Sequence, residues 1–282
     1  THMKKLMFAV CAAALCSAFA DEKKAETELV EQKAPILWGF ANYGIYSGYQ
    51  LYGNLVNCEP TLQGYAEVNF NLPCDLGYAG VGLWSNTDLT SQRHKSYQQA
   101  FNEYDPNFHW DKTFWLDDDC TWGINYHTWF VWYIYPNSNT HSTWDWDHTV
   151  SLVNPFVTPY VTWVHEYSEN SNLIEFGLRR PTQITDGFSI CPSANFVWRE
   201  AQYYWCFPTQ GFQTHANSGL ATMRLQLDCN YQVCSWFSIW GKVAYCCTLD
   251  DDLRSIQDDS SGADYAKYSD FAWGGIGIAV NF

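Results

Sequence analysis

Over short stretches, apolar and polar residues alternate one by one along this chain, and this alternation predicts β-strands. In the clearest stretch, apolar residues are Leu62, Ala66, Val68, Phe70 and Leu72, and the residues between them are Gln63, Tyr65, Glu67, Asn69 and Asn71. Similar alternation occurs over 144–152, 174–179 and 221–228. A side-chain period of two belongs to a strand with one apolar and one polar face. The pattern therefore predicts an all-β, antiparallel fold.

Twelve strands are predicted, at 37–53, 60–72, 76–88, 108–117, 122–135, 144–153, 157–168, 172–181, 193–205, 218–229, 233–247 and 266–282. Short connections alternate with long ones along the chain. The short ones are Leu72–Asp75, Asp118–Thr121, Asn154–Phe156 and Asn230–Gln232, and the long ones are 90–107, 136–143, 206–216 and 248–265. The connection near 181–192 is longer than this rule expects. An even strand number with short turns at one end and longer loops at the other is typical of a closed transmembrane barrel.

The same alternation would also suit a soluble sandwich, in which the apolar face forms the core. In a membrane barrel the apolar face meets lipid and the polar face lines the lumen. Aromatic residues at strand ends, such as Tyr133, Tyr135 and 203–205, favour the barrel because interfacial girdles use them. Aromatic residues make up 18% of the chain and charged residues only 16%, below the ~25% of ordinary soluble domains. An aromatic-rich secreted carbohydrate-binding sandwich is the alternative.

The last fifteen residues, 268–282, read as a strand with an apolar outer face and small inner residues. Ile276, Ile278 and Val280 fall on one face, with Gly275 and Gly277 on the other. A closed barrel pairs its final strand with its first, which leaves no open edge. We therefore expect 268–282 to pair with 37–53. The terminal Phe282 looks like the C-terminal assembly signal of bacterial outer-membrane barrels, which implies the barrel-assembly machinery as a partner.

The N-terminus predicts export. Residues 1–20 combine a cloning remnant (Thr1 and His2) with a signal peptide, whose basic start is followed by an apolar run and an A-x-A cleavage site. Residues 21–35 are expected to form a periplasmic extension, and 36–282 the barrel. Removing Lys4 and Lys5 with residues 1–20 changes the net charge from −15 to −17, and such acidity argues against nucleic acid as a partner.

Three further stretches carry a family resemblance. They are SGYQLYGN at Ser47–Asn54, EPTLQGYAE at Glu59–Glu67 and GYAGVGLWSNTDL at Gly77–Leu89, with Tyr133–Pro136 as a fourth element. Together they resemble the TorF-type porin family of bacterial outer membranes. Gly48 and Tyr52 stand where that family has Asp and Arg, so the roles of those two residues do not carry over. The resemblance implies an outer-membrane channel and leaves its solute open.

Nine cysteines remain after cleavage, nearly all of them in predicted turns or at strand ends. An oxidising compartment favours disulfides over metal binding. Cys229 and Cys234 flank one predicted tight turn and are expected to pair. Cys74 and Cys120 lie in successive periplasmic turns and are a second candidate pair. No metal site or cofactor is expected, and solvated turns are the preferred interpretation of Asp117–Asp119 and Asp250–Asp252.

The predicted function is that of a narrow diffusion channel for small polar or ionic solutes, set among outer-membrane lipid and lipopolysaccharide. The candidate lumen residues are Glu67, Asp145, Asp147, Glu175, Arg179, Arg224, Asp228 and Lys242. Acidic residues concentrate in the predicted outer loops and upper strand ends, which predicts a preference for cations. No catalytic arrangement is evident around His127 or His165, so no enzyme is expected. The alternative is a closed structural or adhesive barrel, and the oligomeric state stays open.

Overall fold

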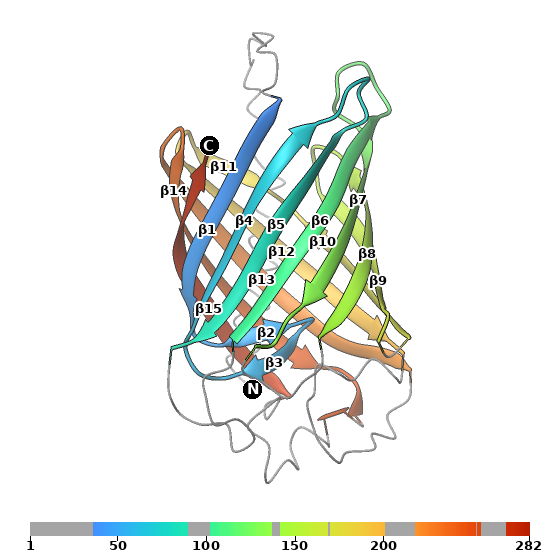
Figure 1. Cartoon of the computed structure of the whole chain (residues 1–282), viewed down its shortest axis with the longest axis vertical. Coiled ribbons are helices and arrows are strands. Elements are labelled where there is room, and N and C mark those ends of the chain that lie inside the picture. Colours follow the sequence, from blue (N-terminus) through green and yellow to red (C-terminus); the bar gives the residue numbers. More distant parts are fainter. Residues whose placement is uncertain are drawn as a thin grey trace.

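The computed structural model describes residues 36–89, 102–136, 142–168, 170–200, 218–251, 253–254 and 269–282. The predicted signal peptide and extension, residues 1–35, lie outside the described residues. The rest forms one closed antiparallel barrel (Figure 1). Among the residues that the structure describes, no helix is long and apolar enough to cross a bilayer.

Twelve strand positions make up the wall, in chain order. They are β1 (Leu37–Tyr46), β4 (Thr61–Asn71), β5 (Tyr78–Asp88), β6 (Asn102–Trp115), β7 (Gly123–Tyr133), β8 (Thr143–Val153), β9 (Thr158–Glu166), β10 (Ser171–Arg179), β12 (Phe188–Arg199), β13 (Gly219–Cys234), β14 (Phe237–Thr248) and β15 (Asp270–Asn281). The short β11 (Thr182–Thr185) pairs with β12 beyond the end of β10, so it shares the position of β10 in the wall.

The first and last wall strands close the barrel, as the sequence predicts. β1 pairs with β15 in a register that places Gly44 opposite Gly277. The backbone of Phe282 continues this ladder by exchanging two hydrogen bonds with Gly39, of 2.7 and 3.0 Å. Gly44 and Gly277 leave the space that the Trp240 ring fills, because a Cβ at either position would overlap it.

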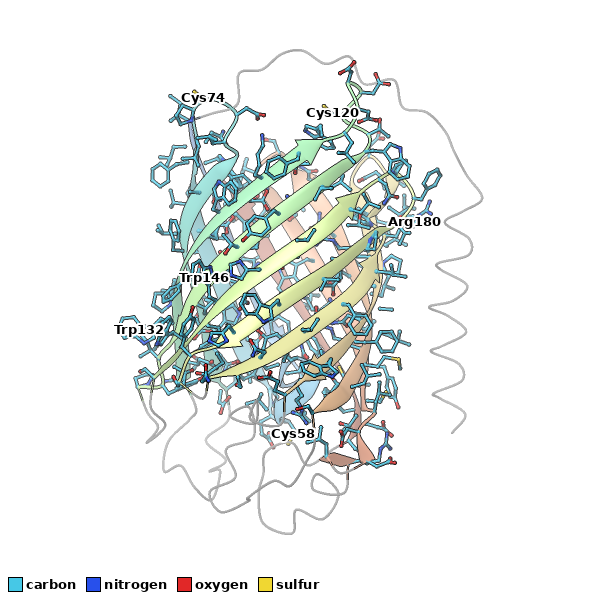
Figure 2. The ribbon with its side chains drawn as sticks, turned by 90° about the vertical axis from the view of Figure 1, so that its right-hand side faces the viewer. Cys58, Cys74, Cys120, Trp132, Trp146 and Arg180 are labelled. Carbon is cyan, nitrogen blue, oxygen red and sulfur yellow. The ribbon has the colours of Figure 1, made fainter. Side chains whose placement is uncertain are left out.

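The distribution of apolar and polar side chains across the wall is the reverse of that in a soluble protein. Large apolar side chains point outward and are exposed, including Val81 (54%) and Ile276 (65%), whereas Asn69 and Glu166 point inward and are 0% exposed. Figure 2 shows aromatic side chains such as Trp132 and Trp146 on the outer surface. A sandwich would bury the apolar set between two sheets. The sandwich alternative is therefore wrong.

Four predicted strand ends are corrected by the structure. The first strand stops at Tyr46 rather than at residue 53, because the chain then turns inward as a separate hairpin. β6 begins at Asn102, six residues before the predicted start. It tolerates Pro106 because the β6–β7 ladder ends at Asn107 and resumes only as an isolated bridge between Tyr104 and Ile134. β12 begins at Phe188, so the connection after β10 is short after all.

The fourth correction removes the basis of a predicted disulfide. β13 runs on to Cys234, and the turn lies at 235–236 rather than at Asn230–Gln232. Cys229 lies opposite Gly241 and Cys234 opposite Phe237, so both belong to one strand instead of flanking a turn. Both are free cysteines, and the pairing of Cys229 with Cys234 is contradicted.

Cys74 and Cys120 lie in successive turns at the same end of the barrel, as predicted (Figure 2). Both have a positive φ, of 57° and 52°, and both are exposed free cysteines. The structure therefore does not contain this second predicted pair.

Candidate functional site

A hairpin folded into the barrel is the most distinctive feature of the lumen. It consists of β2 (Tyr49–Leu51) and β3 (Asn54–Asn57), which pair with each other and not with the wall. Its turn falls at Tyr52 and Gly53, with φ angles of 48° and 80°, and the Gln50 Oε1 accepts a hydrogen bond from the Gly53 N–H at 3.1 Å. Figure 1 shows the hairpin inside the end of the barrel that carries the long connections.

Apolar contacts hold this hairpin against walls on different sides of the bore. Tyr49 and Val56 are buried against Val131, Tyr133 and Tyr135, on and just beyond β7. Because these contacts replace water on both surfaces, they stabilise the inward position of the hairpin.

On another side, Leu51 and Tyr52 pack against Val164, Leu173 and Val197, from β9, β10 and β12. The hairpin therefore spans the bore from β7 to β9–β12.

Polar contacts fix the tip and the base of the hairpin. Thr222 of β13 donates a hydrogen bond from Oγ1 to the Tyr52 carbonyl at 2.8 Å. The Tyr49 hydroxyl donates to the Glu103 carboxylate of β6. Burial, and after it the nearby carboxylates of Glu103 and Asp105, raise the pKa of the Tyr49 phenol well above its ordinary value, so Tyr49 stays a neutral donor.

Between the hairpin and the end that carries the short turns, the lumen opens into a cavity of about 680 Å³. Its lining combines aromatic rings with charged groups, and the charged residues among them are Asp105, Asp111, Asp147, Glu175, Arg179, Arg224 and Lys242. A second cavity of about 400 Å³ follows toward the turn end and shares Tyr46 and Lys242 with the first. The Lys242 ammonium lies 5.8 Å from the Tyr46 ring centre and 5.5 Å from that of Trp240. Tyr46 and Lys242 therefore lie where the two cavities adjoin.

The charged side chains of the first cavity divide into an acidic wall and a mixed wall. Asp105, Asp111 and Asp147 come from β6 and β8, and no Lys or Arg on β5–β8 lines either cavity within the described part of the chain. Opposite them, two of the three basic residues are paired: Arg224 lies 3.8 Å from Glu175, and Lys242 lies 3.7 Å from Asp228. The structure thus places charges of different character on different sides of the bore.

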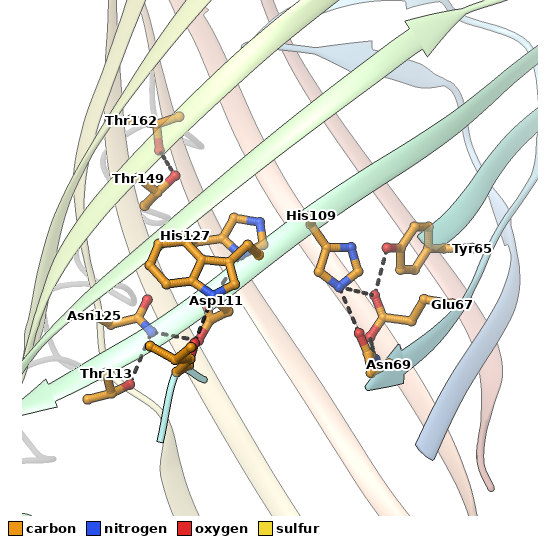
Figure 3. A network of polar contacts seen from close by, with 12 residues as sticks. Tyr65, Glu67, Asn69, His109, Asp111, Thr113, Asn125, His127, Thr149 and Thr162 are labelled. Carbon is orange, nitrogen blue, oxygen red and sulfur yellow. Dashed lines mark hydrogen bonds and ion pairs between the residues drawn. The ribbon is translucent and has the colours of Figure 1, made fainter. Parts of the chain in front are cut away.

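Two polar networks continue the acidic wall toward the turn end (Figure 3). In the first, Glu67 accepts hydrogen bonds from Tyr65 (2.6 Å) and Asn69 (2.8 Å), and His109 lies 2.8 Å from Asn69 Oδ1. In the second, Asp111 lies 3.3 Å from His127 Nδ1 and accepts a hydrogen bond from Asn125 at 2.9 Å. These contacts hold the carboxylates on the wall.

Of the eight sequence-predicted lumen residues, Asp147, Glu175, Arg179, Arg224 and Lys242 line the first cavity and Asp228 lines the second. Glu67 belongs to the first network described above, and Asp145 is fully buried and accepts a hydrogen bond from Tyr133 at 3.2 Å. The acidic residues that sequence reasoning missed include Glu103, Asp105, Asp111 and Glu166. Glu103 and Asp105 were assigned to a loop, although their alternation with Tyr104, Pro106 and Phe108 continues the strand period.

The outer acidic clusters are only partly described. Asp250 and Asp251 belong to the described residues, whereas Asp252, Asp258, Asp259 and Asp264 lie outside them. In this region Arg254 forms an ion pair with Asp270 at 3.3 Å.

Comparison with solved structures identifies the architecture. The barrel is similar to an outer membrane channel from Pseudomonas putida F1, with a TM-score of 0.55 and 9% identity over 93% of this chain and 100% of that chain. The NanC porin follows, with a TM-score of 0.49 and 11% identity over 86% and 98% of the two chains. The fold is that of a bacterial outer-membrane β-barrel. Its short turns are then periplasmic and its long connections extracellular.

No protein-family profile matches the chain, and no curated protein matches it. The comparison with structures also corrects one expectation. Outer membrane phospholipase A from Escherichia coli is another neighbour, with a TM-score of 0.46 and 10% identity over 86% of this chain and 92% of that chain. Because similar barrels include outer-membrane enzymes, the prediction that this chain is not an enzyme is withdrawn.

Proposed function

We propose that the protein is a narrow outer-membrane channel for passive diffusion of small polar or ionic solutes, with a preference for cations. The observation that carries this proposal is the polar lumen itself: two cavities of about 680 and 400 Å³ adjoin along the bore and share Tyr46 and Lys242 in their linings. A barrel of twelve strands has a narrower bore than general porins of 16–18 strands. Residues that cross the bore therefore decide what passes.

The cation preference rests on the acidic wall. Lumenal Lys and Arg side chains that line the described cavities lie on β10, β13 and β14, and two of the three are ion-paired. Asp105 and Asp147 face the same cavity without an ion pair among the described residues. In a bore with low-dielectric walls such carboxylates concentrate cations.

The proposal extends to partners and family. The resemblance of Ser47–Asn54, Glu59–Glu67 and Gly77–Leu89 to the TorF-type porins supports a channel. Lipopolysaccharide and the barrel-assembly machinery, the latter through Phe282, are the proposed partners within the outer membrane.

One observation favours a rival function. The hairpin reaches across the bore, since Leu51 and Tyr52 pack against Val164 and Leu173 on the far wall. If it never moves and leaves no path beside it, the barrel is a closed structural or surface-binding element.

Conductance separates the two functions. The full chain, refolded in detergent and inserted in a planar lipid bilayer, should give discrete current steps in KCl, and a boiled sample should give none. A properly folded preparation that inserts without any steps would establish the closed barrel instead.

A further inference from the structure

Two buried carboxylates of the acidic wall face the larger cavity without a full set of partners. Asp105 is 5% exposed and Asp147 is 9% exposed. Oδ1 of each residue has no hydrogen-bond partner among the described residues, and both residues line the cavity. Because a buried carboxylate oxygen without a partner is costly, such an oxygen in a cavity indicates a ligand that donates a hydrogen bond or carries positive charge.

Each of these carboxylates has a tryptophan directly beside it. The strand register places Asp105 opposite Trp84 and Asp147 opposite Trp129. Both indoles line the same cavity. Directly paired residues on adjacent strands have Cβ atoms about 5 Å apart. A cation held at either carboxylate is therefore within reach of an indole ring.

The spacing of the two aspartates does not suit a metal ion. They are separated by β7 and by four positions of register, since Asp147 pairs with Trp129 whereas Asp105 lies near the Tyr133 end of that strand. Standard strand geometry makes this separation roughly 15 Å between Cα atoms. No group of three His, Cys, Asp or Glu side chains among the described residues could hold a metal.

A single carboxylate next to an indole is the arrangement that binds organic ammonium groups, through charge attraction and the cation–π interaction. We propose that Asp105 with Trp84, and Asp147 with Trp129, form two successive binding sites for organic ammonium cations. The proposal rests on the cation preference argued above and names the solute class. The first site lies nearer the hairpin, where Tyr49 contacts Trp84 with ring centres 5.4 Å apart, and the second lies deeper in the cavity.

The test uses the refolded full chain in detergent micelles, so it does not depend on whether the barrel conducts. Binding of choline is followed through its methyl signal in saturation-transfer NMR. We expect saturable binding at two sites. Each of Asp105→Asn and Asp147→Asn should abolish one of them, and the double variant should weaken choline binding at least fivefold. The uncharged carbon analogue of choline, 3,3-dimethyl-1-butanol, should bind at least fivefold more weakly than choline.

Matched controls separate binding from folding and from bulk charge. Asp118→Asn removes the same charge from an exposed periplasmic turn and should leave choline binding unchanged. If Asp105→Asn fails to show the heat-dependent gel shift of a folded barrel, Trp84→Leu replaces it, and Trp129→Leu replaces Asp147→Asn in the same way; each should weaken binding at its own site. In a competition experiment, KCl and unlabelled choline chloride are each added at the same ionic strength to protein with bound choline. If KCl displaces the bound choline as well as choline chloride does, the binding is a general charge effect and the proposal is overturned. Choline binding that is unchanged in the folded lumenal variants overturns it as well.

The outcomes also separate this inference from the channel proposal. Choline binding without bilayer conductance would refute the channel and keep the ammonium sites. Conductance without choline binding would keep the channel and refute the sites.

Discussion

The ion pair between Glu175 and Arg224 lies in the larger cavity of the bore. The carboxylate lies 3.8 Å from the guanidinium, and both side chains are mostly buried. Tyr160 adds a hydrogen bond to Glu175 at 2.7 Å. While the pair is intact, Arg224 contributes little net positive charge to a passing ion.

Glu175→Gln should therefore release the charge of Arg224 into the lumen. We expect the ratio of K⁺ to Cl⁻ permeability to fall about threefold, because an unpaired cation in a medium of intermediate dielectric repels K⁺ over several ångströms. Loss of the charged partner should also cost about 2 kcal/mol of unfolding free energy. Reversal potentials and urea titrations in micelles measure the two effects. Asp118→Asn serves as the control, and an unchanged permeability ratio would show that Arg224 does not face the path.

At this scale the sequence predicts which face a residue occupies but not which residue it contacts. The alternation of side chains every two residues along a strand predicted that Glu175 and Arg224 lie on the inner face. Their pairing depends on how far strands are staggered around the whole barrel, which no local pattern encodes. The same limit explains the contradicted disulfide: a shift of the β13–β14 turn by a few residues moved Cys229 and Cys234 onto one strand.

Among the elements, the β2–β3 hairpin was not predicted, because its residues continue the apolar and aromatic character of the first strand. The positions that end β1 are visible only in retrospect: Tyr52 and Gly53 take positive φ values in the hairpin turn. Once the chain turns inward, the aromatic residues that suggested a lipid-facing strand instead pack against the lumen wall.

Removing the hairpin should widen the channel. Tyr46 and Thr61 are paired neighbours at the ends of β1 and β4, so a linker of about four Gly and Ser residues can replace 48–58 without disturbing the wall. We expect single-channel conductance in KCl to rise at least threefold. A deletion variant that folds but conducts like the parent would show that the hairpin is not the constriction.

A point substitution tests the anchor of the hairpin. Thr222→Val keeps the side-chain shape but loses the hydrogen bond to the Tyr52 carbonyl, which contributes about 1 kcal/mol. The open-channel current should become noisier as the tip moves. The control is Thr162→Val, which removes the 2.8 Å contact between Thr162 and Thr149 on the wall. Equal noise in both variants would contradict the assigned role of Thr222.

The seam between β1 and β15 depends on glycine. A Cβ at Gly277 would overlap the Tyr43 carbonyl as well as the Trp240 ring, and backbone cannot move aside as a side chain can. Gly277→Ala should therefore destabilise the barrel by about 2 kcal/mol, as overpacking does. Gly241→Ala on β14 is the matched control, since the nearest atom to its Cβ would be 3.8 Å away. Urea unfolding followed by tryptophan fluorescence measures the stability of both variants. Equal unfolding midpoints for Gly277→Ala and Gly241→Ala would contradict the close packing assigned to Gly277 between β1 and β15.

For the whole molecule, the alternation of side chains, the even strand number and the lengths of most connections predicted the closed barrel. These features are local and repeat in every strand, so errors at single strand ends did not change the architecture. The contents of the lumen were predicted less well, because they depend on a segment that leaves the wall and on contacts between strands distant in sequence.

The closed barrel has a direct consequence in gels. Its strands form one continuous hydrogen-bonded ring through the β1–β15 and β10–β12 pairings, and such a ring resists SDS at room temperature because no edge is open to attack. Unboiled protein should migrate differently from boiled protein. Identical migration of both samples would contradict a ring that is closed by β1 and β15.

The reversal potential across a KCl gradient tests the central claim most directly, because it reports which wall of the lumen controls passage. Exposed vestibule charges are screened within ~8 Å at physiological salt. We therefore expect clear cation selectivity at low salt that weakens at high salt as the contribution of the outer acidic residues is lost. A residual preference should remain from the buried Asp105 and Asp147. Anion selectivity at low salt would contradict the account, since it would mean that Arg179, Arg224 and Lys242 control the bore.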